Sequence, residues 1–170
     1  MSDRFFEDYC YYQSPIGLIR ISGTEGFVTR SDFVVKSHLS EHSHSESISN
    51  TSTLLRDACR QLDEYFEGIR QNFDISLRPY GTHFQLSAWE SLLQIPYGET
   101  RSYLQQAENI LNPRAIRAIG QANSKNPISI FIPCHRVIGK NGSLTGYAGG
   151  LERKTHLLAM ERRFMHEQNY

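Results

Sequence analysis

One stretch of the sequence predicts the position of a cysteine in the fold: Ile132-Pro133-Cys134-His135-Arg136-Val137. It follows Ile-Ser-Ile-Phe-Ile at residues 128–132, where apolar residues alternate as in a strand with one buried face. Pro133 cannot donate the next ladder hydrogen bond, so the predicted strand ends there. We therefore expect Cys134 to be held rigidly at the end of a buried strand.

Cys134 is a candidate nucleophile. A thiol reacts as its thiolate, its ordinary pKa is about 8.5, and an imidazole is a natural acceptor for its proton. His135 is adjacent and Glu161 lies downstream, so both residue types that activate a thiol are present. A lone cysteine is more often a small buried apolar residue, but Pro-Cys-His-Arg after an apolar run favours the nucleophile.

The composition is that of a folded globular protein of one or two domains. Of 170 residues, 39% are hydrophobic and 21% are charged, which argues against disorder throughout. The three cysteines form neither a CxxC pair nor a disulfide framework, so we interpret Cys10 and Cys59 as packing residues in a reducing compartment. No leader segment or membrane-spanning apolar run is apparent. We expect a soluble, cytoplasmic protein.

The formal net charge is zero, but the two halves differ in sign. Residues 1–83 hold 8 Lys and Arg against 12 Asp and Glu, a net of −4, whereas residues 84–170 hold 10 against 6, a net of +4. The positive half carries Cys134. Charge alone is compatible with a polyanionic partner for this half or with a merely solvated face.

The first half predicts a small sheet with one helix. Ser14-Pro15-Ile16-Gly17 is a turn sequence, and apolar residues from 54 to 69 recur at spacings of three and four, typical of a core helix that ends near Gly68. The predicted strands cover residues 9–12, 18–21, 26–33 and 73–77. The polar segment 36–53 is expected to be a surface loop, and its three histidines lack a partner cluster that would complete a metal site: His38, His42 and His44.

Pro79-Tyr80-Gly81 punctuates the chain, and Thr82 with Gln85 predicts a capping box, so we divide the chain into domains 1–81 and 82–170. The second domain opens with a helix whose apolar face begins at Phe84. Ser102 then caps a helix expected at 103–110, and Asn112-Pro113 opens one expected at 114–124. The pair is a helix-turn-helix pattern, which by itself more often reflects packing than DNA binding.

The second helix of the pair has a small surface. A major-groove reading helix carries several long polar side chains, whereas here Arg117 is the single long cation among small residues. Such a surface suits the narrower minor groove, with the cation filling a gap in the base stack. The small residues are Ala115, Ala118, Gly120 and Ala122.

These motifs together resemble the O6-alkylguanine-DNA alkyltransferases, also called methylated-DNA–protein-cysteine methyltransferases, of the stand-alone bacterial type. The resemblance is close from residue 84 to residue 161, and in the first half it extends only to the order of the elements. It rests on Pro133-Cys134-His135-Arg136, Asn126-Pro127, Arg117, Tyr103 and Gly146-Tyr147-Ala148-Gly149-Gly150. It implies an α/β (α+β) fold: an N-terminal ribonuclease H-like α/β domain followed by a mostly helical winged helix-turn-helix domain with the active-site cysteine.

The resemblance also implies the chemistry. Cys134 attacks the alkyl carbon of O6-alkylguanine or O4-alkylthymine, His135 takes the thiol proton through a water, and Glu161 stabilises the imidazole. Tyr103 stabilises the departing guanine. The thioether product does not hydrolyse, so each molecule acts once, without metal or cofactor.

For DNA the resemblance implies a monomer on the minor groove of double-stranded DNA, with the alkylated base flipped out. Ala115 and Ala118 face the groove and Arg117 replaces the flipped nucleotide. Asn126 orders the segment between the recognition helix and the active site. Tyr147, Ala148 and Gly149 line the base pocket, although Ala148 stands where many relatives have Ser, which puts one hydrogen bond to the base in doubt. Ile116 stands where relatives often have a smaller residue.

Three other classes stay open. A Cys-His hydrolase fits the cysteine and histidine but leaves the helix pair unexplained. An alkyltransferase-like lesion-binding protein keeps the DNA surface but lacks the nucleophile, which Cys134 provides here. A helix-turn-helix regulator requires base-reading side chains that the second helix does not carry.

Overall fold

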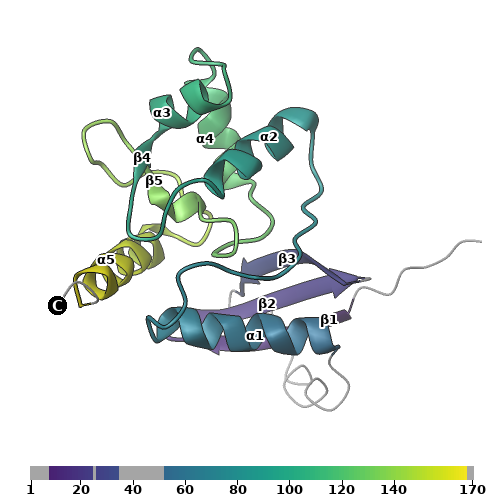
Figure 1. Cartoon of the computed structure of the whole chain (residues 1–170). Helices are drawn as coiled ribbons and strands as arrows, with labels where there is room; N and C mark the ends of the chain where they lie inside the picture. Colours follow the sequence, from purple (N-terminus) through teal and green to yellow (C-terminus); the bar gives the residue numbers. More distant parts are fainter. Residues whose placement is uncertain (1–7, 25, 35–51, 168–170) are drawn as a thin grey trace, which may run out of the picture. The chain divides into compact units, whose positions relative to one another are not determined.

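The computed structural model describes residues 8–24, 26–34 and 52–167. The chain divides into two compact units, residues 1–79 and residues 80–170. In the part of the chain that is described, the first unit combines strands with one helix, and helices dominate the second (Figure 1). The mixed α/β class expected from the sequence is confirmed.

The first unit is built on an antiparallel sheet of order β1-β2-β3. Its strands are β1 (Asp8–Ser14), β2 (Gly17–Thr24) and β3 (Phe27–Phe33). Ser14 pairs with Gly17 across a two-residue turn, and Gly17 has a φ of 128°, which glycine adopts at little cost. The three strands and the turn that the sequence predicted here are confirmed.

Helix α1 (Thr53–Phe66) lies along one face of this sheet (Figure 1). Ser52 caps its first turn by accepting a hydrogen bond from the main-chain N–H of Leu55. The helix ends before Gly68, whose φ of 77° suits a chain leaving a helix. Ile69 was expected on the apolar stripe but lies beyond the helix and is 69% exposed. The buried residues between helix and sheet include Ile19, Ile21, Val28, Leu62 and Tyr65.

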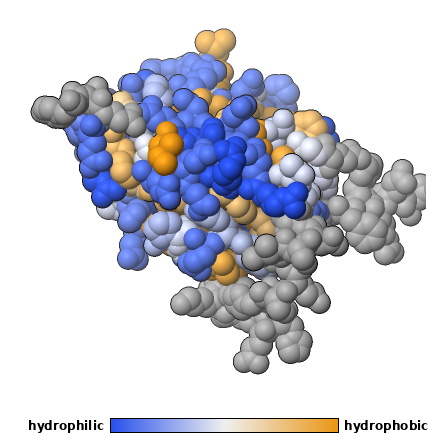
Figure 2. All heavy atoms as spheres, turned by 60° about the horizontal axis from the view of Figure 1, so that its bottom comes forward, coloured by the Kyte–Doolittle hydropathy of each residue, from blue (hydrophilic) through white to orange (hydrophobic). Residues whose placement is uncertain are grey.

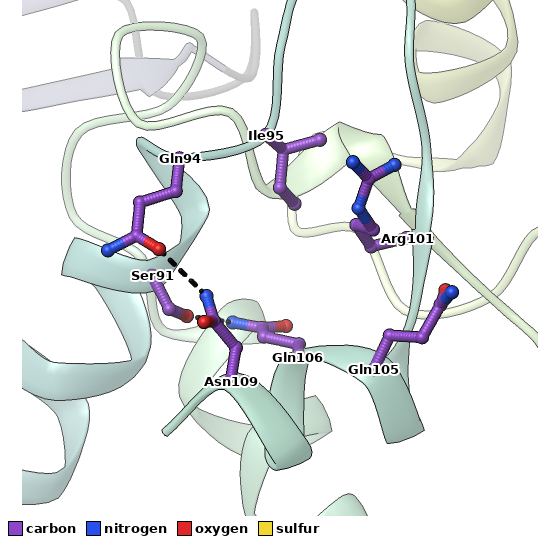
Figure 3. A pocket seen from close by; sticks show the side chains of 7 residues that line it. All are labelled: Ser91, Gln94, Ile95, Arg101, Gln105, Gln106 and Asn109. Atoms are coloured by element: carbon purple, nitrogen blue, oxygen red, sulfur yellow. Dashed lines mark hydrogen bonds between the residues drawn. The ribbon is translucent and has the colours of Figure 1, made fainter. Parts of the chain in front are cut away.

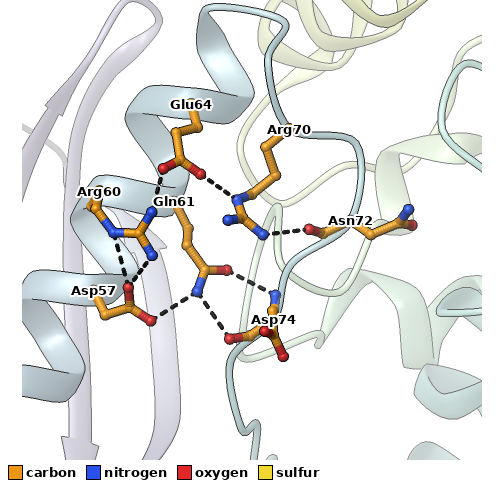
Figure 4. A network of polar contacts seen from close by, with 7 residues as sticks. All are labelled: Asp57, Arg60, Gln61, Glu64, Arg70, Asn72 and Asp74. Carbon is orange, nitrogen blue, oxygen red and sulfur yellow. Dashed lines mark hydrogen bonds and ion pairs between the residues drawn. The ribbon is translucent and has the colours of Figure 1, made fainter.

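The strand predicted at 73–77 is wrong. Leu77 forms a single parallel bridge with Val28 of β3, and no ladder continues from it among the described residues. The main chain of Asp74 is instead satisfied by a side chain: Gln61 Nε2 donates to Asp74 O at 2.9 Å and Asp74 N donates to Gln61 Oε1 at 2.8 Å (Figure 4). The alternation of apolar residues therefore marks an extended segment that is bound to α1 at Asp74 and to β3 at Val28, which donates to Ser76 O and accepts from Arg78 N.

Charged residues surround Gln61 on the same side of α1 (Figure 4). Arg60 pairs with Asp57 and Glu64, and Arg70 Nε lies 2.6 Å from Glu64 Oε2. Exposed pairs of this kind contribute little to stability, about 0 to 1 kcal/mol. Gln61, which is 1% exposed, contributes differently, because its side chain holds the main chain of Asp74 against α1 with two hydrogen bonds.

Hydrophilic residues cover most of the face drawn in Figure 2, where hydrophobic residues stand singly. Single apolar residues on a surface are normal, and their exposure alone does not mark an interface. Within the described ranges, none of the helices is both long and apolar enough to cross a membrane.

The second unit packs three helices around a small core. Ala88, Ala107, Ile119 and Ala122 form its buried cluster, and Trp89 Nε1 donates to Ala122 O at 2.8 Å. Figure 1 shows the short parallel pair β4–β5 and helix α5 in the same unit. The elements are α2 (His83–Leu92), β4 (Arg101–Ser102), α3 (Tyr103–Asn109), α4 (Ile116–Ser124), η2 (Cys134–Arg136), β5 (Val137–Ile138) and α5 (Leu151–Glu167).

The predicted capping of α2 and α3 is confirmed: Thr82 with Gln85, and Ser102 with Gln105, form complete capping boxes. The predicted start of α4 at Asn112-Pro113 is wrong. The helix begins at Ile116, and no side chain caps it. Asn112 instead continues the turn that ends α3, so its side chain is not in the N-cap position.

Candidate active site

Cys134 follows a compact turn, so the strand predicted at 128–132 is wrong. Ile132 N donates to Ile128 O at 3.0 Å, and Ile130 has a φ of 72°, which no strand contains. Cys134 is the first residue of the 3-10 helix η2. The alternating apolar residues predicted a strand with one buried face. In the structure every residue of the turn is buried, including Ser129 and Phe131 at 5% and 2% exposure.

The side chain of Asn126 holds this turn together. Its Nδ2 donates to Ile132 O at 2.8 Å and to Cys134 Sγ at 3.2 Å, while its Oδ1 accepts from Ile128 N at 3.1 Å. Asn126 itself is 4% exposed. One buried amide therefore fixes both the path of the chain and the position of the sulfur.

His135, the next residue, meets a buried carboxylate from α5. His135 Nε2 lies 2.8 Å from Glu161 Oε1, and both side chains are fully buried. Arg136 binds the same carboxylate in bidentate fashion, with Nε and Nη2 each 3.0 Å from an oxygen, and its Nη1 donates to Ile95 O at 2.7 Å. Gly98 N donates to Glu161 Oε2 at 3.0 Å. His135, Arg136 and Gly98 all bind Glu161, and of these the sequence indicated only His135 as its partner.

The electrostatics of this cluster set the protonation states. Burial tends to raise the pKa of Glu161, but the charges and hydrogen bonds of His135 and Arg136 hold it well below 4.5. Burial lowers the pKa of His135 below 6.5 despite the nearby carboxylate. At neutral pH the carboxylate is ionised and the imidazole is neutral, so Nε2 carries the proton and donates to Glu161.

The other ring nitrogen is therefore free to act as a base. His135 Nδ1 is buried and has no hydrogen-bond partner among the described residues. Buried polar atoms are usually hydrogen-bonded, so this lone pair is a candidate for a role in proton transfer. The arrangement can take a proton from a neighbouring thiol.

Burial raises the pKa of the Cys134 thiol, whereas the Asn126 hydrogen bond and the positive charge of Lys154 lower it. Lys154 is fully buried on α5, and its Nζ donates to Val137 O at 2.6 Å and to Thr145 O at 2.8 Å. Sequence reasoning missed Lys154. The available signal was its spacing of seven residues before Glu161, which puts both on one face of a helix.

Tyr103, the first residue of α3, meets the same loop as Lys154. Its hydroxyl donates to Thr145 O at 3.0 Å, and the ammonium of Lys154 lies 6.0 Å from its ring centroid. The carbonyl of Thr145 therefore joins α3 and α5. This places the Tyr103 hydroxyl at the start of the segment that carries Tyr147.

That segment contributes one buried ring to the site. The Tyr147 ring stands edge-on to His135 at 6.5 Å between centroids, and its hydroxyl is buried without a partner among the described residues. Burial raises the pKa of Tyr147 well above 10.0, so the hydroxyl stays protonated. Gly149 is buried and Ala148 is exposed.

Of the residues proposed for the DNA surface, Arg117 and Ala118 lie on α4, and Ala115 is the residue before its first turn. Arg117 and Ala118 are exposed and Ala115 is intermediate, whereas Ala122 is 3% exposed and belongs to the core. The expectation that Ala122 forms part of the small outer surface is therefore wrong. Ile116 is turned outward and is 42% exposed.

A separate pocket of about 390 Å³ lies between α2 and α3 (Figure 3). Amide side chains dominate its walls, and none of the site residues predicted from the sequence lines it. The described residues contain no group of three His, Cys, Asp or Glu side chains placed to hold a metal. The predicted loop histidines His38, His42 and His44 lie outside the described residues.

Both units match known protein families. Residues 8–79 match the ribonuclease-like domain of 6-O-methylguanine DNA methyltransferase, and residues 83–163 match its DNA binding domain. The methylated-DNA–protein-cysteine methyltransferase of Methanosarcina acetivorans is 48% identical over 153 residues, which cover 90% of this chain and 97% of that protein. The constitutive Bacillus subtilis enzyme of the same name is 43% identical over 159 residues, or 91% and 94% of the two chains.

Solved structures agree with the family models. The O6-methylguanine methyltransferase of Mycobacterium tuberculosis superposes with a TM-score of 0.82 at 41% identity and covers 93% of this chain and 94% of its own. The same Mycobacterium protein in complex with DNA gives a TM-score of 0.81 at 42% identity, with coverage of 92% and 93%. The chain therefore belongs to the 6-O-methylguanine DNA methyltransferase family.

Proposed function

We propose that the chain repairs double-stranded DNA by moving the alkyl group of O6-alkylguanine, and of O4-alkylthymine, irreversibly to Sγ of its own Cys134. The hydrogen bond from Asn126 to Cys134, beside a neutral His135 held by Glu161, is the observation that carries the proposal. Membership of the methylated-DNA–protein-cysteine methyltransferase family supports the same reaction class.

In the proposed step the Cys134 thiolate attacks the alkyl carbon, a C–S bond forms, and the C–O bond to guanine breaks. The thiol proton passes through a water to Nδ1 of His135, and Glu161 stabilises the imidazolium. Tyr103 supplies the proton or hydrogen bond that the departing guanine needs. The roles of Tyr103 and His135 are supported by the hydroxyl at the edge of the site and by the unpaired Nδ1.

The thioether product explains why each molecule acts once. Acyl intermediates of hydrolases are cleaved by water, but a C–S bond in a thioether is not. The step as proposed needs no metal or cofactor, because Cys134 supplies the nucleophile and the alkylated base supplies both the alkyl group and the leaving group. A protein that only binds the lesion does not need a nucleophile, so the buried Cys134 next to the buried His135 favours the transfer reaction over lesion binding.

DNA is the partner of the family's DNA binding domain, which residues 83–163 match. We propose that residues 82–170 act as a monomer on the minor groove, that Ala115 and Ala118 face the groove, and that Arg117 takes the place of the flipped nucleotide. Tyr147, Ala148 and Gly149 then line the pocket for the extruded base. Exposure of Arg117 and Ala118 supports this surface.

Intact-mass measurement after incubation with O6-methylguanine duplex tests the reaction. We expect one CH₂ unit of added mass on Cys134 and one lesion repaired per molecule. Cys134→Ala should abolish transfer while leaving DNA binding largely intact, because the substitution removes no phosphate contact. Repair of many lesions per molecule would overturn the proposal.

Arg117→Ala separates extrusion of the base from the chemical step. Repair in duplex DNA must overcome a few kcal/mol of unstacking, which free O6-benzylguanine does not require. We expect Arg117→Ala to slow repair of the duplex far more than reaction with the free base. Tyr103→Phe should slow both substrates, and equal losses for Arg117→Ala on both would show that Arg117 has another role.

A further inference from the structure

Leu111 occupies the position after α3 where helices usually place glycine. Leu111 N donates to Glu108 O and Asn112 N donates to Ala107 O, each at 2.9 Å, which are the paired bonds of a Schellman motif. Leu111 has a φ of 58°, in the left-handed region. Glycine or asparagine adopts this conformation readily, whereas a residue with a bulky side chain is disfavoured there.

The side chain of Leu111 receives no packing in return for this strain. It is 92% exposed, more than any other large hydrophobic side chain in the ranges that the structure describes. The left-handed backbone costs the native state free energy, and the exposed side chain recovers none of it by burial. Features of this kind point to function.

The surroundings of Leu111 indicate what it contacts. It begins the turn between α3 and α4, and Pro113 and Arg114 follow it in the same turn, both exposed. Arg117, the second residue of α4, is exposed as well. Guanidinium groups beside an outward aliphatic side chain suit a polyanion that also offers apolar surface, which is the minor-groove edge of duplex DNA with its sugars and base edges.

We propose that Leu111 is a DNA-contacting residue, which packs its side chain against the minor-groove edge of the duplex beside the phosphates held by Arg114. The inference rests on the proposed function and deepens it by naming an apolar contact to the duplex. Leu111 has no part in the reaction at Cys134. Its contribution is to duplex affinity, gained at the expense of stability.

Leu111→Asn tests whether Leu111 increases duplex affinity at the expense of stability, because asparagine tolerates the left-handed backbone but lacks the apolar surface. We expect its Tm to rise by about 2 to 4 °C and its Kd for lesion-containing duplex to increase about tenfold. Leu111→Met keeps the apolar contact and should bind nearly as wild type. Ile69→Asn is the matched control, because Ile69 is an exposed aliphatic residue of the first unit and should leave the Kd unchanged.

The salt dependence of binding separates the apolar contact from charge. Leu111→Asn should weaken binding equally at all salt concentrations, with an unchanged slope of log K against log salt. Arg114→Ala should reduce that slope by about one, because one phosphate contact is lost. A changed slope for Leu111→Asn would overturn the apolar assignment.

Reaction with free O6-benzylguanine distinguishes failure of this inference from failure of the proposed function. Leu111→Asn should alkylate Cys134 at the wild-type rate, since the free base needs no duplex contact. Wild-type duplex affinity in Leu111→Asn overturns the role of Leu111 whatever its Tm, and leaves the proposed function intact. Loss of benzylguanine transfer in the wild type would instead refute the proposed function.

Discussion

Glu161 is a fully buried carboxylate that satisfies one imidazole, one guanidinium and one main-chain N–H. Such a group has two consequences at the scale of a single residue. It fixes the tautomer of His135, and it compensates the charge of Arg136, which is itself 5% exposed. The proposed chemistry and the stability of the fold therefore depend on the same side chain.

Glu161→Gln keeps the shape of the side chain but leaves the buried Arg136 without a counter-charge. We expect a loss of about 3 to 5 kcal/mol in the free energy of unfolding and slower alkyl transfer. Urea denaturation measures the first effect and reaction with O6-benzylguanine the second. Glu167→Gln on the exposed face of the same helix is the control, with an expected change within about 0.5 kcal/mol.

The pKa shifts of the pair also predict the pH dependence of stability. Both groups have depressed pKa values in the folded state, so on acidification the unfolded chain takes up their protons first and stability is lost. The loss from His135 should begin as pH falls below 6.5, and that from Glu161 as it falls below 4.5. Urea denaturation across this pH range measures the effect. Glu161→Gln should lack the loss of stability that begins below pH 4.5. Stability that rises on acidification would contradict the assignment.

At the scale of elements, buried side-chain amides of Gln and Asn connect helices that share no main-chain hydrogen bonds in the described part of the chain. Gln106 of α3 and Asn123 of α4 exchange hydrogen bonds of 3.1 and 2.7 Å. Gln106 also donates to Ala88 O of α2 at 3.0 Å. These hydrogen bonds fix the position of α4 relative to α3, and therefore relative to Tyr103, the first residue of α3.

Asn126→Ala removes the corresponding amide from the active-site turn. Ile128 N and Ile132 O then lose their partners in a buried place, and each unpaired group costs about 1 to 3 kcal/mol. We expect lower stability by chemical denaturation and slower alkylation of Cys134. Asn109→Ala removes an exposed amide that bonds Gln94, and should change the stability by no more than about 0.5 kcal/mol. Similar losses for both variants would argue against the role of Asn126.

At the scale of the whole molecule, alkylation should destabilise the protein. Cys134 is 4% exposed and its sulfur accepts the hydrogen bond of Asn126. Added carbon atoms in a packed interior typically cost about 1 to 3 kcal/mol, and the thiolate that the surrounding groups serve is lost. A cell clears a destabilised product more readily, because the native state is only marginally stable.

Melting curves of free and benzylated protein test this expectation. A cost of about 1 kcal/mol lowers the Tm of a chain of this size by about 2 to 4 °C. Cys134→Ala exposed to O6-benzylguanine is the control and should keep its Tm. A midpoint that stays the same or rises after complete alkylation would show that the site accepts the group without strain.

Elements whose signals are local could be predicted from the sequence alone. The hairpin at Ser14–Gly17, the capping boxes of α2 and α3, and the amphipathic stripe of α1 depend on residues a few positions apart. The sequence also indicates Cys134, His135 and Glu161 as candidate site residues, because a thiol, an imidazole and a carboxylate together can activate a nucleophile. Their proposed roles stay predictions.

Tertiary structure decided the rest, because those features depend on contacts between distant residues. The segment at 73–77 forms one bridge to β3, while Gln61 binds the main chain of Asp74. The turn at 128–132 is held by Asn126, which binds Ile128 and Ile132. The buried position of Lys154 is likewise set by carbonyl groups of another segment. Apolar alternation reports burial, and only the folded chain determines which partner satisfies a buried main-chain group.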